Sequence, residues 1–148
     1  MSQKTEKPVP NPKGEIKLTN QELRALMVSD GMQRLIDARN ISPKLKFQTL
    51  MLTKKLSEIL ETVEKVRREI IEQYAERDKY GRQITVNNLV QFGTNTKEAT
   101  EKLDELMGEE VTLSGGKIAV DLDGDAVPKD LLSARDMMAL SAVIEFKE

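Results

Sequence analysis

The residues most suggestive of chemistry are three aspartates at alternate positions, Asp121, Asp123 and Asp125. Carboxylate oxygens bind Ca²⁺ and Mg²⁺, and a metal held there could support hydrolysis of phosphate esters. An EF-hand loop beginning at Asp121 would need Gly at its sixth position and Glu at its twelfth, where this chain has Ala126 and Leu132. The spacing favours a solvated acidic turn. A metal-dependent phosphoesterase using residues 121–125 stays as an alternative.

Other catalytic arrangements lack their usual residues. The chain has no cysteine and no histidine, which excludes disulfides, Cys/His zinc sites and a Ser-His-Asp triad. It has 25 acidic residues, but none stands within an apolar stretch that would raise its pKa. We therefore predict no catalytic residue, no metal site and no cofactor, and hence a protein that is not an enzyme.

Nucleic-acid binding is the second alternative. The net charge is only −2, and the basic residues of the central segment alternate with glutamates. The five aromatic residues are dispersed, which makes a base-stacking surface unlikely to form. Charge is uneven, however: residues 109–148 hold nine acids and four bases, a net of −5, so residues 1–108 carry +3. The acidic C-terminal region is a candidate contact for a protein partner.

A long central helix must carry most of the packing. Ser42 and Pro43 are a typical helix start, and the pattern predicts a helix over about 43–78. Apolar residues then recur at alternating intervals of four and three, as in coiled coils. This interaction seam consists of Leu52, Leu56, Ile59, Val63, Val66 and Ile70. Further apolar residues at Leu50, Leu60 and Ile71 widen the stripe and indicate that the helix packs on two neighbours.

The first predicted helix covers about 20–38. Thr19 and Glu22 are spaced as a capping box at its start. Gly31 interrupts it, which indicates either a kink or break in the helix or close packing of another backbone.

The second half of the chain predicts short elements. A strand is expected at about 83–90 and a helix at about 96–107. Strands at about 110–114 and 117–121 flank Gly115-Gly116, which predicts a tight hairpin between them. A helix over 134–140, capped by Ser133 and Asp136, and a strand at about 142–146 complete the pattern.

The predicted fold class is α+β, because helices concentrate in the first half and strands in the second. We expect a long helical hairpin, or coiled-coil-like rod, with a small antiparallel β appendage, all in one domain over 18–148. Residues 1–17 contain Pro8, Pro10 and Pro12 and are expected to be a disordered arm. With no apolar run of 18 residues and no signal-peptide pattern, we expect a protein that is not secreted by a signal peptide and makes no membrane contact.

Several segments together resemble a family of small uncharacterised proteins encoded by tailed phages and prophages, chiefly of Gram-positive bacteria. The similar segments are Gly31–Leu35, Ile41–Phe47, Tyr74–Gly81 and Ser133–Leu140, and the likeness spans about 16–146. The family brings no established active site. The resemblance implies a phage accessory or assembly protein.

The leading hypothesis is a non-enzymatic phage-type interaction protein that acts through the long amphipathic helix and the acidic C-terminal β region. It could be an accessory, assembly or host-interaction factor, located in the cytoplasm of the host cell or in the virion. Its expected partners are itself, as a homo-oligomer, and an unidentified protein.

Overall fold

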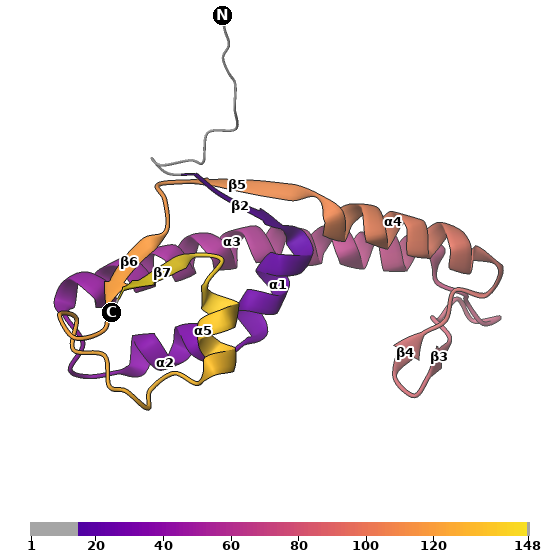
Figure 1. Cartoon of the computed structure of the whole chain (residues 1–148). Helices are drawn as coiled ribbons and strands as arrows, with labels where there is room; N and C mark the ends of the chain where they lie inside the picture. The colour runs from indigo at the N-terminus through magenta and orange to yellow at the C-terminus, as the bar shows by residue number, and fades with distance from the viewer. Residues whose placement is uncertain (1–14, 148) are drawn as a thin grey trace, which may run out of the picture.

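The computed structural model describes residues 15–147, and they form an α+β fold, as predicted (Figure 1). The expected N-terminal arm lies mostly outside the described residues, but its last three, 15–17, belong to a strand. In chain order the elements are β2 (Glu15–Thr19), α1 (Asn20–Val28), α2 (Gly31–Asp37), α3 (Pro43–Tyr74), β3 (Thr85–Val86), β4 (Leu89–Val90), the 3₁₀ turn η1 (Gly93–Asn95), α4 (Thr96–Gly108), β5 (Glu110–Ser114), β6 (Ile118–Asp121), α5 (Ala134–Leu140) and β7 (Ile144–Lys147).

Helix α3 starts as predicted and ends earlier than predicted. The Ser42 hydroxyl accepts a hydrogen bond from the N–H of Leu45, and Pro43 is the first helical residue. The helix ends at Tyr74 rather than near residue 78. The next residues pair instead with the following segment: Glu76 bonds through its backbone to Ile84 and Gln91. The chain therefore turns back where local sequence alone favoured further helix.

The predicted helix over 20–38 is two helices. The capping box at its start is confirmed, since Thr19 and Glu22 each accept the other's backbone N–H. Helix α1 ends at Val28 and α2 begins at Gly31. A Cβ on Gly31 would lie 3.0 Å from Cδ1 of Leu140 in α5. The prediction of a break is thus confirmed, whereas the atoms that approach Gly31 most closely belong to the side chains of Leu140 and Asp136 rather than to another backbone.

Strand pairing differs from the prediction. Strand β5 pairs antiparallel with the N-terminal strand β2, and β6 pairs parallel with the C-terminal strand β7. The predicted hairpin between 110–114 and 117–121 is wrong, and so is the expectation of a wholly antiparallel appendage. Gly115, at φ +86°, does turn the chain. Two glycines in sequence indicate that the chain turns, but they do not determine which strands pair. Pairing depends on burying apolar residues that are distant in sequence, such as Ile16 in β2 and Ile144 in β7.

The strand predicted at 83–90 is a small hairpin. Strands β3 and β4 are joined by Asn87 and Asn88, which both have positive φ. A tight type I′ turn requires positive φ at both central residues, and asparagine adopts positive φ more readily than most residues do. The last strand begins two residues later than predicted, at Ile144.

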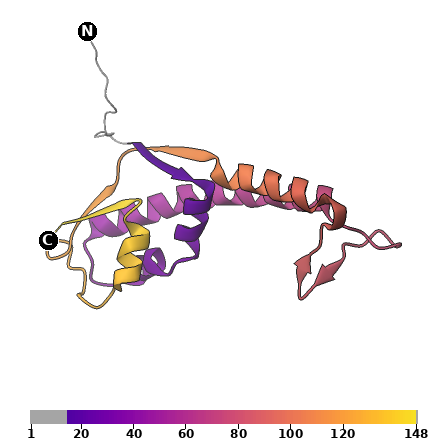
Figure 2. The same ribbon diagram turned by 45° about the vertical axis from the view of Figure 1, so that its right-hand side comes forward.

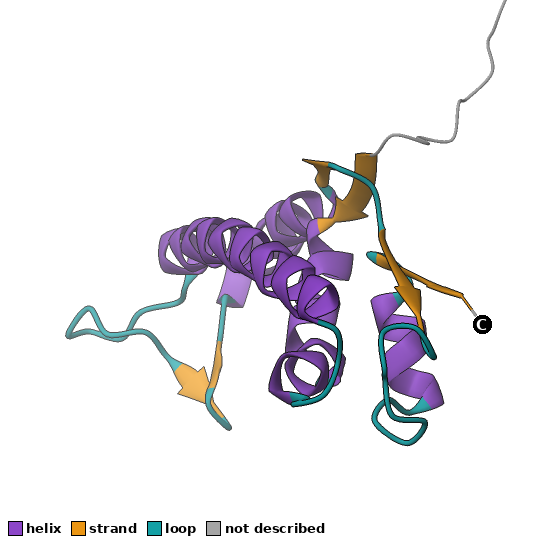
Figure 3. Ribbon diagram, turned by 90° about the vertical axis from the view of Figure 1, so that its left-hand side faces the viewer, coloured by secondary structure: helices purple, strands orange, loops and turns teal. Residues whose placement is uncertain are grey.

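Two groups of elements cover α3. Helices α1 and α2 and strand β6 contact it, and α4 lies alongside its second half (Figures 1 and 2). Viewed from the end in Figure 3, the β6–β7 pair and α5 lie together to one side of the helices. One apolar core joins α1, α2, the first half of α3, α5 and the two sheets formed by β2, β5, β6 and β7.

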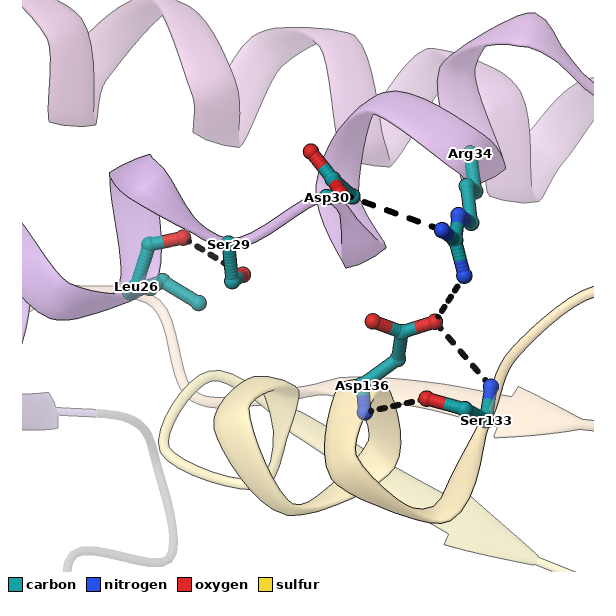
Figure 4. A network of polar contacts seen from close by, with 6 residues as sticks. All are labelled: Leu26, Ser29, Asp30, Arg34, Ser133 and Asp136. Atoms are coloured by element: carbon teal, nitrogen blue, oxygen red, sulfur yellow. Dashed lines mark hydrogen bonds and ion pairs between the residues drawn. The ribbon is translucent and has the colours of Figure 1, made fainter.

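A buried carboxylate links α5 to α2. Asp136 is 6% exposed, and its Oδ2 accepts hydrogen bonds from the N–H of Ser133 at 3.0 Å and from Nη1 of Arg34 at 2.6 Å (Figure 4). The backbone of Ser133 contributes most to lowering the pKa of Asp136, and Arg34 lowers it further against the opposing effect of burial.

This pKa predicts acid sensitivity. A carboxyl whose pKa is lower in the folded state stabilises the fold above its unfolded-state pKa, and the contribution disappears as pH falls through the folded-state pKa. We expect Asp136→Asn to destabilise the protein at neutral pH and to flatten the loss of stability in acid. Urea unfolding at a series of pH values measures both effects. Asp30→Asn is the control, because the Asp30 side chain also pairs with Arg34 but is 77% exposed. Equal effects of the two variants would contradict the prediction.

Candidate interaction surface

The predicted interaction seam is covered within the chain. Leu56 and Val63 are 0% and 5% exposed, and the other four seam residues are half-buried. Leu52 and Ile59 pack against the main core, and the second half of α3 lies beside α4. The structure therefore places all six seam residues together on one face of α3 and assigns that face to intramolecular packing.

The opposite face of α3 carries three exposed large apolar side chains. Phe47, Leu50 and Met51 are 65%, 46% and 46% exposed. Their spacing of three and four residues puts them on one side of the helix, about half a turn from Leu56. We define the outer face as these three residues with the exposed charged residues that flank them along α3: Lys44, Lys54, Glu58, Glu61 and Lys65.

The outer face is not among the surfaces predicted from the sequence. The prediction that Leu50 widens the apolar stripe for a second packing neighbour is wrong, because Leu50 is exposed, whereas Leu60 packs against the core. A signal was present: at about 100° per residue, Phe47 and Leu50 lie about 140° and 160° around the helix from Leu52, and Met51 lies about 100° from it. Apolar residues on both sides of one helix indicate two separate contacts rather than one wide contact.

A groove borders the outer face. It has a volume of about 440 Å³ and lies between α3 and the turn that joins β5 to β6. Its apolar lining comes from Ile16, Phe47, Met51, Leu52, Leu113 and Ile118. Lys55 and Lys117 also line it. Such a groove can receive an apolar side chain of a partner, with the two ammonium groups nearby for a carboxylate.

The acidic turn at 121–125 is held by its own hydrogen bonds. Oδ1 of Asp121 accepts the N–H groups of Asp123 and Gly124, at 3.2 and 3.0 Å. The Asp125 carboxylate accepts the hydroxyl of Ser42 at 2.6 Å and the N–H of Asp121 at 2.9 Å. The hydrogen bond from Ser42 connects the turn to the start of α3. Among residues 15–147, no group of three or more acidic side chains is placed to hold a metal ion.

A second exposed apolar group lies beyond the C-terminal end of α3. Tyr80, Val86 and Leu89 are exposed in and beside the β3–β4 hairpin, and the Tyr80 ring is flanked by Lys79 and Arg82. None of the helices within 15–147 combines the length and apolar character needed to cross a membrane.

Comparisons of this chain with protein-family models, curated proteins and solved structures found no match.

Proposed function

We propose that this is a non-enzymatic protein–protein interaction protein of the phage accessory or assembly type, and that it binds through the outer face of α3. The observation that carries the proposal is the exposure of Phe47, Leu50 and Met51 together on one helix face. Large apolar side chains that cluster on a surface are typical of protein interfaces, and aromatic and methionine residues are enriched there.

The helix that presents these residues is held rigidly. Leu45 and Thr49, which alternate with them along α3, are buried, and so is Leu56 about two turns after Thr49. A rigid surface loses little conformational entropy on binding, which favours recognition of a partner. In this proposal α3 and α4 act as a hairpin-like helical rod, and the acidic region 109–148 supplies a second, electrostatic contact.

The resemblance to phage and prophage proteins supports the proposed biological setting. Infected cells are therefore the source in which to look for a partner. The same setting is compatible with action in the host cytoplasm or in the virion.

The test is a comparison of two surface variants by pull-down from infected cells. We expect Phe47→Ser with Met51→Ser to remove proteins that the wild-type chain captures, because serine deletes the apolar contact area and leaves the fold intact. Val28→Ser is the control, since Val28 is 73% exposed, more than Phe47 or Met51, but belongs to α1. Circular dichroism should show the same helix content for all three proteins. Capture that is unchanged in the double variant would refute the proposed surface.

A further inference from the structure

We infer that the outer face of α3 binds the same face of a second copy of this chain, with the two helices antiparallel and a twofold axis near Leu50 and Met51. The inference rests on the proposed function and names its partner. It depends on the order of charged and apolar residues along the exposed face.

The outer face divides into three zones along the helix. Lys44 comes first, the apolar group of Phe47, Leu50 and Met51 follows, and a mixed group of Lys54, Glu58, Glu61 and Lys65 comes after it. At about 100° per residue, all of these positions lie within roughly a sixth of a turn of Phe47. This face is complementary to itself when one copy is reversed, because the apolar groups then meet and Lys44 of each copy lies near Glu58 of the other.

The antiparallel register follows from the apolar zone. If Leu50 faces Met51 of the second copy, Phe47 lies opposite Lys54, and Lys44 lies beside Glu58. The aliphatic stem of Lys54 can cover the Phe47 ring, with its ammonium group near the ring face. A twofold axis produces each of these contacts twice.

Other arrangements of two copies fit less well. A parallel pair would put Lys44 beside Lys44 and Glu58 beside Glu58, which repel. An antiparallel pair displaced toward the C-terminal end would put Met51 opposite Glu61, so that the apolar groups of the two copies no longer meet. Only the register centred on Leu50 and Met51 joins the apolar groups and also pairs opposite charges.

The contact is short, which places it among weak interfaces, and we expect a dimer that dissociates on dilution in the micromolar range. Light scattering across a dilution series measures this. A chain that stays monomeric at every concentration would overturn the inference, and the pull-down with the Phe47 and Met51 double variant would still decide the proposed function separately.

Cysteine cross-linking tests the register. The chain has no cysteine, so an introduced one is the only thiol. We expect Met51→Cys to form a disulfide-linked dimer under mild oxidation, because residues near the axis meet their own copies. Lys65→Cys is the control on the same face: it lies about 21 Å along the helix from Met51 and cannot reach its copy. Cross-linking of Lys65→Cys in place of Met51→Cys would overturn the inference.

Charge exchange tests the pairing. We expect Glu58→Lys to raise the dissociation constant of the dimer about fivefold, because it sets two lysines side by side at both ends of the contact. Combining it with Lys44→Glu should restore the constant to within about twofold of wild type. Failure of the double variant to recover, while both variants keep the wild-type circular dichroism spectrum, would reject the proposed register.

Discussion

Replacing Leu56 with aspartate is expected to leave the chain unfolded in water. Leu56 is 0% exposed and belongs to the main core, where α3 meets the elements that cover it. Truncating a fully buried leucine to alanine costs about 2–5 kcal/mol, which is a large part of the roughly 5–15 kcal/mol that stabilises a typical domain. Aspartate adds the cost of a buried charge without a partner.

Leu50→Asp is the matched control for this experiment. It makes the same exchange on the same helix, so the loss of helix propensity is shared, but Leu50 is 46% exposed on the outer face. We expect it to change the free energy of unfolding by less than about 1 kcal/mol. Circular dichroism during urea unfolding compares the variants, in protein dilute enough that association through Leu50 does not contribute. Similar destabilisation by both substitutions would mean that the two faces of α3 are not distinct.

Gly31→Leu is expected to destabilise the protein by about 1–3 kcal/mol, through overpacking. A Cβ at this position would lie 3.0 Å from Cδ1 and 3.1 Å from Cγ of Leu140, and 3.4 Å from the Cβ of Asp136. Leu140 is itself fully buried, so it has little room to move. The added side chain would push α5 away from α2 and disturb the bond between Asp136 and Arg34.

Gly108→Leu separates this contact from helix propensity. Gly108 is the last residue of α4, and nothing lies within 4 Å of a Cβ built there. Leucine favours helix more than glycine does, so we expect an unchanged or slightly higher melting temperature. Thermal unfolding of both variants measures the difference. A melting temperature for Gly31→Leu that equals the wild-type value would show that α5 is free to move away.

The sequence correctly predicted the helix starts that depend on hydrogen bonds between residues close together in the chain. The capping boxes at Thr19 and Ser133 and the Ser42-Pro43 start satisfy backbone groups within one turn, so their residues are visible in the sequence. The period of the apolar seam correctly marked the face of α3 that other elements cover, because a 3.6-residue repeat decides which side chains share a side.

Tertiary structure alone decided which elements meet. Strand β5 could have paired with β6 across the Gly115-Gly116 turn. Each strand pairs instead with one from an end of the chain, where the partner's apolar side chains join the common core. Likewise, the repeat of the seam could be covered by a second chain or by α1, α2 and α4. Periodicity records that a face is apolar, whereas the identity of its partner depends on contacts between residues far apart in sequence.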